Sequence, residues 1–360
     1  MADYQIAVFP GDGIGLEVMG SAMAVLEALE SRYGFSLDKT RRDGGATYYR
    51  ETGRDLPDGA FEAARQADAI LFGAMGLPDV RLPDGTEVAP HLDMRREFGL
   101  YAGVRPARKY PNTPALLADP RAEQSDLIVL RESTEGLFAS RGRGTIEGGR
   151  VARDTMEITR ETSEALFDFA FKLARRRADK GRGQRRVTCV DKSNVFVSMA
   201  FFRSIFDERA AQNTDVEANH AYVDAAALDL VRKPWTADVL VMENMFGDIL
   251  SDLCGGLVGG MGMAPCAEIG ANHALFQPAH GSAPDIAGRG ISNPTAMLVS
   301  TAMMLDWLGE KAGDQRLVDA GDSLDRAVYQ AYADAAILPY ELGGRSDTRA
   351  VTEAVIAALD

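Results

Sequence analysis

Short apolar runs alternate with longer amphipathic segments along most of the chain. The runs have the length and β-branched content of strands, and they lie at 5–10, 67–73, 125–131, 186–192 and 237–242. Apolar residues recur with a helical period over 16–31 and 158–177, which predicts helices with one buried face. This alternation is typical of α/β architecture with much parallel sheet. No repeat or linker marks a domain boundary, and the glycine-rich segment 255–262 is either a hinge or a place of close packing.

The bulk composition narrows the class of protein without changing this fold. The chain has 360 residues, of which 46% are apolar and 26% charged, as in a globular protein of two lobes. Its formal net charge of −14 argues against a nucleic-acid or membrane partner. This net charge does not exclude a locally basic cleft that binds a small polyanion. Three cysteines without CxxC spacing predict neither a disulfide framework nor a zinc site. With no signal-like or membrane-spanning run, we expect a cytoplasmic protein.

Two carboxylates stand four residues apart in ENMFGDILSDLCGG, residues 243–256. If this segment is a helix, Asp248 and Asp252 lie on one face, where exposed like charges repel by roughly 0.2–0.5 kcal/mol. The spacing therefore predicts a cation beside them.

Two glycine clusters are candidate ligand loops. PGDGIGLEV at 10–18 follows a predicted strand and opens a helix, but Leu16 breaks the dinucleotide fingerprint and no P-loop lysine follows, which weakens a phosphotransferase interpretation and leaves an ordinary turn open. HGSAPDIAGRGISNP at 280–294 carries Asp285, an acid able to accept bonds from a ribose diol and to repel a 2′-phosphate. A surface Ω-loop is the alternative for this second cluster.

Several charged residues stand at the expected ends of elements. Arg95, Arg105 and Arg131 could together clamp a di- or tricarboxylate through bidentate bonds, although each alone is as compatible with a solvated or ion-paired arginine. Lys192 ends the predicted strand at 186–192, and Asp224 belongs to a predicted helix within 219–231. Taken singly, both fit surface positions.

In combination, these segments resemble a known family: the metal-dependent, NAD(P)-linked β-decarboxylating dehydrogenases of 2-hydroxy acids, which include isocitrate, isopropylmalate, homoisocitrate and tartrate/D-malate dehydrogenases. The resemblance runs nearly end to end and in the family's order. It is carried by PGDGIGLEV, RREFGLYAGVRP, LRESTEG, DKSNV, YVDA, NMFGDILSD and HGSAPDIAGRGISNP. It implies the two-lobe isopropylmalate dehydrogenase-like fold, α/β with a large mixed sheet flanked by helices, and not a standard Rossmann fold.

The resemblance also implies the chemistry. Asp248 and Asp252 of one subunit, with Asp224 of its partner, match the ligands of Mg²⁺ or Mn²⁺, a hard cation that polarises the substrate hydroxyl. Lys192 matches the catalytic lysine, which takes the hydroxyl proton directly or through Asp224 and water. The three arginines match the substrate-carboxylate arginines, and K⁺ is a further ion expected from the family.

The family resemblance divides the chain into two lobes and a dimer. Residues 1–107 with 258–360 are expected to form the larger, NAD-binding lobe, and 108–257 the smaller lobe with the catalytic lysine, the metal-binding aspartates and the dimer interface. Because Lys192 and Asp224 match residues donated across that interface, the active form is expected to be a homodimer with shared sites.

The cofactor residues follow from the same alignment of motifs. An acid at Asp285, followed by Ile286 instead of tyrosine, matches NAD-linked members. The residues matching the adenosine loop or the nicotinamide neighbourhood are Ile14, Gly73 within the loop 73–76, His280, Gly281, Ser282, Ala283, Asp285 and Asn293.

Two departures from the family pattern bear on the substrate. Phe138 stands seven residues after Arg131, where members have the tyrosine that reprotonates the enolate after decarboxylation, and a phenyl ring has no proton to give. Either another donor replaces it, or oxidation proceeds without that acid, or the change is neutral. In VAPHLDMR, Ala89 and His91 replace the polar pair of isocitrate enzymes, and His91 replaces one leucine of the isopropylmalate set, leaving Leu92.

These residues favour NAD- and metal-dependent oxidation of a small, polar (2R)-malate-type 2-hydroxy acid, with or without β-decarboxylation. The substrate class nearest to this expectation is that of the tartrate/D-malate branch. A 3-isopropylmalate dehydrogenase is the alternative, and a non-catalytic regulatory homologue is the second alternative.

Overall fold

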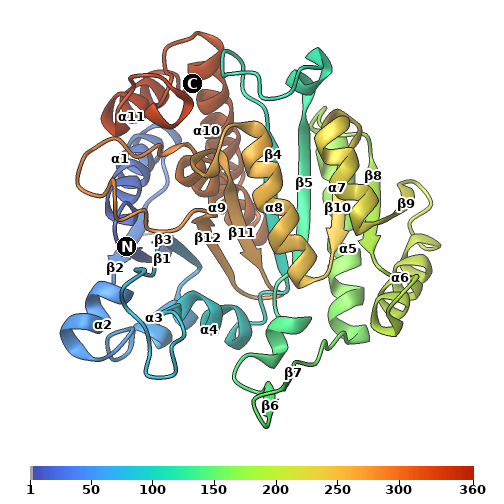
Figure 1. Ribbon diagram of the computed structural model, residues 1–360. Helices are drawn as coiled ribbons and strands as arrows, with labels where there is room; N and C mark the ends of the chain where they lie inside the picture. The colour runs from blue at the N-terminus through green and yellow to red at the C-terminus, as the bar shows by residue number, and fades with distance from the viewer. Residues whose placement is uncertain (1–2) are drawn as a thin grey trace. The chain divides into compact units, whose positions relative to one another are not determined.

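The structure is a computed structural model that describes residues 3–360, and its chain forms two compact units (Figure 1). The first unit comprises the residues up to Phe98, Tyr110–Ala115 and Gly259–Asp360. The second comprises Gly99–Lys109 and Leu116–Val258.

The first unit is built on five adjacent strands. Their order is β2 (Leu37–Arg41), β1 (Tyr4–Gly11), β3 (Ala69–Ala74), β12 (Ala274–Pro278) and β11 (Pro265–Ile269). All these neighbours pair in parallel except β11 and β12, which are antiparallel. The helices of this unit are α1 (Gly15–Tyr33), α2 (Ala46–Thr52), α3 (Ala60–Gln66), α4 (Pro90–Glu97), α9 (Thr295–Ala312), α10 (Gln315–Ala333) and α11 (Thr348–Ala357), with 3₁₀ turns η4 (Met261–Met263) and η5 (Tyr340–Leu342).

Burial on both faces explains the apolar runs of this unit. Every residue of β3 is buried, as expected of a parallel strand with helices on each side. α1 buries Val18, Ala22, Val25, Leu26 and Leu29, one stripe at helical spacing, and ends at Gly34 in the left-handed conformation.

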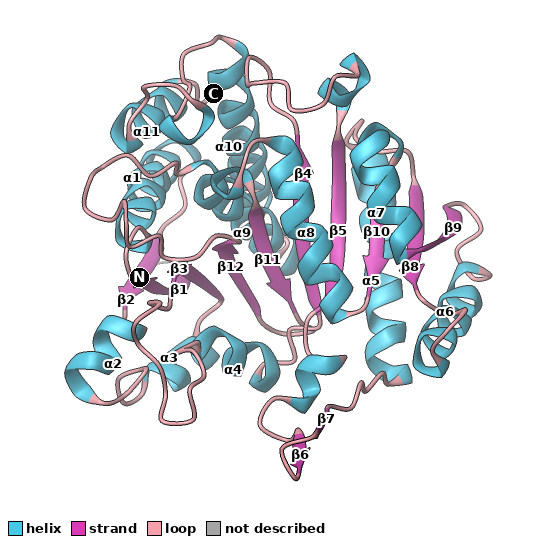
Figure 2. Cartoon of the chain, viewed as in Figure 1, coloured by secondary structure: helices cyan, strands magenta, loops and turns pink. Residues whose placement is uncertain are grey.

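The second unit repeats the arrangement with different strands. Their order is β4 (Ala102–Arg108), β5 (Asp126–Glu132), β10 (Val239–Met242), β8 (Arg186–Asp191) and β9 (Glu217–Tyr222), with β4 antiparallel to β5 and the other neighbours parallel. The remaining elements are α5 (Arg160–Asp179), α6 (Val197–Ala210), α7 (Val223–Arg232), α8 (Asn244–Val258), the 3₁₀ turns η1 (Pro120–Gln124), η2 (Leu137–Ser140) and η3 (Pro234–Thr236), and an exposed hairpin of β6 (Thr145–Glu147) and β7 (Val151–Arg153) (Figure 2). Phe167 of α5 packs against two rings of α6, in a tilted contact with Phe202 and an edge-to-face contact with Phe206.

The predicted strands and helices are confirmed to within a few residues, and so is the fold class of helices flanking mixed sheet. One placement was wrong: Arg105 lies in the middle of β4, not at the end of an element. The expected lobe boundary at 107 also differs from the observed division. β4 belongs to the second unit because it pairs with β5 along its whole length, from Ala102 to Arg108.

Neither a bilayer-crossing helix nor a disulfide is found in the described part of the chain. Over residues 3–360, every helix is too short or too polar to traverse a membrane. Cys189, Cys254 and Cys266 are buried thiols. The glycine-rich segment 255–262 contains the unit boundary, with Gly259 and Gly260 at φ values of 140° and 135° that favour glycine.

Candidate active site

The two carboxylates that opened the metal hypothesis project from α8. This helix begins directly after β10, and Glu243 caps it by accepting bonds from the backbone N–H groups of Met245 (3.0 Å) and Phe246 (2.8 Å). Asp248 and Asp252 follow at i and i+4, hence on one face. The predicted pair of carboxylates has a cationic neighbour in the protein, because Arg131 forms an ion pair with Asp248. Partial burial and then the Asp248 charge raise the pKa of Asp252, while Arg105 and Arg131 act in the opposite direction.

Arg131 is bound by several groups of the second unit. It is 2% exposed near the end of β5, and its Nε and Nη2 donate to Oδ1 of Asn244 at 3.0 and 2.7 Å. The ring of Phe138 lies against the same guanidinium, with its centroid 5.0 Å from the guanidinium carbon. The structure therefore brings together Arg131, Phe138 and Asp248. The sequence analysis missed Asn244, because an asparagine next to an acid within a recognised motif gives no sequence signal of its own.

A buried acid lies behind this arginine. Glu132 is 4% exposed and accepts bonds from the backbone N–H groups of Thr134 and Glu135, each at 2.7 Å. Burial raises the pKa of Glu132 to about 7, although these hydrogen bonds favour its charged form. Sequence reasoning missed this residue too, because the burial that perturbs it depends on the folded chain.

Lys192 and Asp224 meet on the same unit. Lys192 follows β8, Asp224 lies in the first turn of α7, and the two side chains form an ion pair. The hydrogen bond from Lys192 lowers the pKa of Asp224. Within residues 3–360, no three Asp, Glu, His or Cys side chains gather closely enough to hold a metal, so a single chain does not bring Asp224 to Asp248 and Asp252. Its predicted contribution to the partner's site stays a prediction.

Arg95 has an unexpected partner in the first unit. It lies in the last turn of α4, and its Nη2 is 2.8 Å from Oε1 of Glu268, a fully buried residue of β11. Neither side chain is solvated: their exposed fractions are 6% and 0%. His91, one turn earlier in α4, meets the ring of Phe72 edge-on at 5.7 Å, and Leu92 is half-buried beside it. Nothing in the sequence pattern distinguished Glu268 from an ordinary strand residue.

The two glycine clusters of the sequence lie side by side. The Ile14 backbone N–H donates to the Ser282 carbonyl at 2.9 Å, and the Ser282 hydroxyl donates to the Gly76 carbonyl. At Gly13, whose φ is +54°, an added Cβ would lie 2.0 Å from the Ser282 oxygen, so only glycine allows this approach. Residues 10–18 are thus part of one assembly with 280–294, not an isolated turn.

The remaining cofactor candidates surround this assembly. The buried Nε2 of His280 has no hydrogen-bond partner among the described residues, burial lowers the pKa of this ring, and Asp285 is exposed. Gly281 faces open space, whereas Gly73 is needed for packing, because a Cβ there would lie 2.0 Å from the Pro10 oxygen. Glu341, which sequence reasoning missed, accepts bonds from Asn293 Nδ2 (3.1 Å) and Gly262 N (3.0 Å). Ala283 adopts φ of 37° in the tight backbone of this loop.

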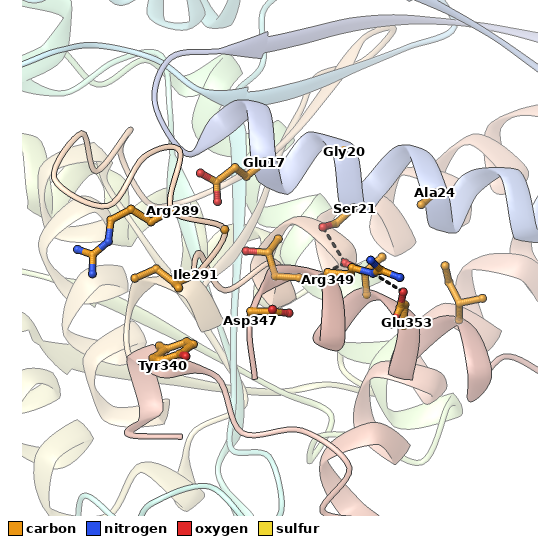
Figure 3. A pocket seen from close by; sticks show the side chains of 14 residues that line it. Glu17, Gly20, Ser21, Ala24, Arg289, Ile291, Tyr340, Asp347, Arg349 and Glu353 are labelled. Carbon is orange, nitrogen blue, oxygen red and sulfur yellow. Dashed lines mark hydrogen bonds and ion pairs between the residues drawn. The ribbon is translucent and has the colours of Figure 1, made fainter. Parts of the chain in front are cut away.

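A groove of about 680 Å³ adjoins the other side of this loop, between α1 and α11 (Figure 3). Its walls include Glu17, Arg289 and Tyr340, and none of the predicted site residues. Glu17 is not available to a ligand: Gly288 N donates to it at 2.5 Å, and so does the Ser292 hydroxyl. Through Glu17, α1 thus anchors the 280–294 loop.

Comparisons with known proteins agree with this arrangement. The family model described as isocitrate/isopropylmalate dehydrogenase matches residues 5–357. The chain belongs to this family. A 3-isopropylmalate/3-methylmalate dehydrogenase of Methanocaldococcus jannaschii is 38% identical over 353 residues, covering 98% of each chain. A 3-isopropylmalate dehydrogenase of Lactococcus lactis is 37% identical over 356 residues, again covering 98% of each.

Solved structures of the isocitrate/isopropylmalate dehydrogenase family share the fold. Isocitrate dehydrogenase from Methylococcus capsulatus superimposes with a TM-score of 0.83 at 33% identity, covering 99% of both chains. A β-decarboxylating dehydrogenase from Thermococcus kodakarensis gives 0.78 at 37% identity, covering 99% of this chain and 96% of that one. Family and relatives together indicate a β-decarboxylating dehydrogenase.

Proposed function

We propose that this protein is an NAD-linked, Mg²⁺- or Mn²⁺-dependent dehydrogenase of 3-substituted (2R)-malates, with 3-isopropylmalate-type alkylmalates as the first substrate class to test. The observation that carries the proposal is the contact between the buried Arg131, an anion-binding group, and the half-exposed Asp248, a candidate ligand for a hard cation. A substrate that bears a carboxylate next to a metal-bound hydroxyl requires such a juxtaposition.

The residues fit a divalent cation and NAD. Two carboxylates on one face of α8 offer hard oxygen donors and leave room for water and substrate, as Mg²⁺ prefers. When bound, the cation would supply Lewis-acid polarisation of the hydroxyl and of the ketone that replaces it. For NAD, the unpartnered Nε2 of His280, the open space at Gly281 and the exposed Asp285 provide a donor or acceptor, close backbone approach and a ribose acceptor.

The chain's own residues would then act as follows. Arg105 and Arg131 bind the substrate carboxylates, and Lys192 Nζ, in its neutral amine form, takes the hydroxyl proton, directly or through Asp224 and water. NAD, when bound, would accept the hydride of C2, so that the 2-hydroxy acid is oxidised to the 2-keto acid. If the bond to the β-carboxylate then breaks, CO₂ leaves and the electron pair of that bond remains on the substrate as an enolate, whose carbon needs a proton. Phe138 cannot supply that proton, so water or another donor must.

The substituent at C3 decides between two candidate substrates. The names of the relatives favour the 3-isopropylmalate alternative over the small polar acid that VAPHLDMR suggested. The polar candidate keeps one specific observation in its favour: α4 presents His91 and Arg95 on neighbouring turns, and Arg95 is bound by Glu268. A polar surface formed by His91 and the Arg95–Glu268 pair suits a hydroxyl substituent on C3 better than an alkyl substituent. A regulatory homologue is less well supported, because the chain keeps Lys192 and all its candidate metal-binding aspartates.

The same proposal includes a homodimer. Apolar side chains are exposed on three helices of the second unit, notably Val197 of α6 (88%), Leu228 of α7 (55%) and Ile249 of α8 (61%). A second copy that covers this surface would account for their exposure and would let Asp224 complete the partner's metal site.

A substrate screen tests the proposal. Purified protein with Mn²⁺ and NAD is given 3-isopropylmalate, 3-methylmalate, (2R)-malate, the tartrates and isocitrate, with NADH and CO₂ measured separately. We expect the highest kcat/KM with an alkylmalate and one CO₂ per NADH. Preference for a tartrate would select the polar candidate, and absence of NADH with every acid would refute the dehydrogenase assignment.

A further inference from the structure

Asn244 lies at the centre of a buried polar network that the proposed chemistry does not explain. It is the first residue of α8, its exposed fraction is 0%, and its Oδ1 accepts two bonds from Arg131. Its Nδ2 donates to the Glu135 carbonyl oxygen at 3.1 Å and lies 3.5 Å from Oε2 of Glu132. The asparagine thus connects the guanidinium to the 132–135 segment.

These contacts fix which way the amide faces. A rotation of 180° would turn the N–H groups toward the N–H donors of Arg131 and the oxygen toward two other acceptors. Both sides would then lose a buried hydrogen bond, which is costly where water cannot replace it. The oxygen is therefore held toward the Nε–Nη2 edge of Arg131.

The side chain of Asn244 is uncharged, and this matters for anion binding by Arg131. An amide oxygen accepts two guanidinium bonds without cancelling the positive charge. Arg95, in contrast, is held by the carboxylate of Glu268, which neutralises it. Arg131 also pairs with Asp248, but that carboxylate is half-exposed and Asn244 adds no second negative charge, so Arg131 keeps more of its charge for an incoming carboxylate than Arg95 does.

We propose that Asn244 is a positioning residue for substrate binding: it holds Arg131 by the Nε–Nη2 edge without neutralising it, so that Nη1 stays directed at Asp248 and the substrate carboxylate beside it. The proposal rests on the proposed function for the identity of the substrate. It goes beyond that function in assigning the role to a residue that touches neither substrate nor cofactor.

The charged groups around Asn244 allow a specific test. Those that face it from the packed elements are Arg131 and Glu132 of β5, Glu135 of the following loop, and Glu243 and Asp248 at α8. The Glu135 side chain bonds to Thr159 and Thr162, and Glu243 caps α8, so Glu132 is the acid nearest to the amide nitrogen. A second carboxylate in place of the amide would therefore oppose Glu132.

The first experiment separates positioning from packing. Asn244→Ala should raise KM for the malate-type substrate about ten- to a hundredfold, the loss expected when hydrogen bonds to a buried charged group disappear, with KM for NAD within about twofold. Cys254→Ala, which removes packing from the same helix without touching Arg131, is the matched control and should change neither value. Equal changes in both KM values, or a change shared by the control, would overturn the proposal.

The second experiment uses pH. In Asn244→Asp, the new carboxylate would neutralise Arg131 and repel Glu132 until one of the two acids takes up a proton. The ratio of its kcat/KM to that of wild type should therefore rise as pH falls from about 8.5 to about 6, which brackets the pKa of about 7 of Glu132. A ratio that does not change with pH would mean that Asn244 only fills space.

A third measurement does not depend on the native substrate. Oxalate should raise the Tm of wild-type protein and raise that of Asn244→Ala much less, because only the held guanidinium is presented to a dicarboxylate. Equal protection, or no protection of wild type, would overturn the proposal. If no malate-type acid is turned over but oxalate protects as expected, the proposed function fails and the positioning role stands.

Discussion

At the scale of single residues, the environment of each charged group decides its role more than its identity does. Arg95 and Arg131 are both buried, and both match substrate-carboxylate arginines of the family motifs. Arg95 is neutralised by the fully buried Glu268, whereas Arg131 is bound by the uncharged amide of Asn244 and by the half-exposed Asp248. The difference arises from one position on β11, and it predicts unequal shares in substrate binding.

The metal hypothesis makes a prediction at this scale. Asp248→Asn should abolish turnover and weaken Mn²⁺ binding by more than about tenfold, an effect that loss of even an outer-shell partner can reach. The fold should remain, because Asp248 is half-exposed and Arg131 keeps its two hydrogen bonds to Asn244. Mn²⁺ titration by calorimetry and circular dichroism measure the two effects. Asp229→Asn, which removes an exposed carboxylate paired with Lys233, is the control. Full activity of Asp248→Asn with EDTA present would refute the metal site.

The cofactor prediction concerns Asp285, which is exposed in the 280–294 loop. Its negative charge should repel the 2′-phosphate of NADP, so that wild type has the higher kcat/KM with NAD. Asp285→Lys combined with Ile286→Tyr should move the preference toward NADP. Steady-state kinetics with both cofactors decide the matter, and a wild type that prefers NADP would contradict the assignment.

Phe138 carries the third prediction. Hydride transfer does not use a phenol, whereas reprotonation of an enol by a positioned acid contributes typically about 10²–10⁴-fold. Phe138→Tyr should therefore raise the ratio of CO₂ to NADH, or the overall rate on a malate-type acid, with little change in KM for NAD. The ring already lies over Arg131, so a hydroxyl there would enter the site. If wild type releases one CO₂ per NADH at a rate that the tyrosine does not improve, Phe138 is ordinary packing.

At the scale of elements, ion pairs connect α5 and the loop that follows it to the sheet of the second unit. Arg182 Nε lies 2.8 Å from Oδ2 of Asp126 at the start of β5, and Arg177 of α5 reaches both Asp126 (3.2 Å) and Asp238 (2.9 Å). Burial by itself raises the pKa of Asp126, but the two arginines prevail and lower it to about 2.

This shift predicts a pH dependence of stability. A carboxyl whose folded pKa is about 2 contributes stability above its unfolded pKa near 3.8, and that contribution is lost as pH falls toward 2. Asp126→Asn should lower the free energy of unfolding by about 2 kcal/mol at pH 7 and by less at pH 3. Urea denaturation at both pH values measures the difference. Asp58→Asn, which breaks an exposed pair with Arg54, should have little effect at either pH.

Elements were also the level at which the sequence was most informative. Apolar periodicity predicted α1, α5 and the strands that became β1, β3, β5, β8 and β10, because burial on known faces imposes a period on the chain. The partners of the site residues were not predictable in this way. Glu268 meets Arg95, and Asn244 meets Arg131, only because a helix and a strand distant in sequence pack together, and no local pattern records such a contact.

At the scale of the whole molecule, the homodimer is the central expectation. Leu228→Asp should place a charge in the proposed interface, give a monomer by light scattering, and reduce turnover strongly, because Asp224 lies on the same helix and would no longer reach a partner. Leu116→Asp substitutes a residue of similar exposure, 52% against 55%, and should leave the assembly unchanged. A wild type that is monomeric and fully active would contradict shared sites.

The first unit is assembled from both ends of the chain, and this has a consequence for synthesis. β3 receives its neighbour β12 only after residue 278 has been made, and α1 is closed by α11 through bonds such as Arg32 Nη1 to the Leu359 carbonyl (3.0 Å). The second unit is complete by Val258. At ribosomal rates of about 5–20 residues per second, the N-terminal strands wait on the order of ten seconds or more for their neighbours. A nascent chain that stalls between residues 258 and 278 therefore holds one finished unit and one open apolar sheet, which is the species a chaperone would meet.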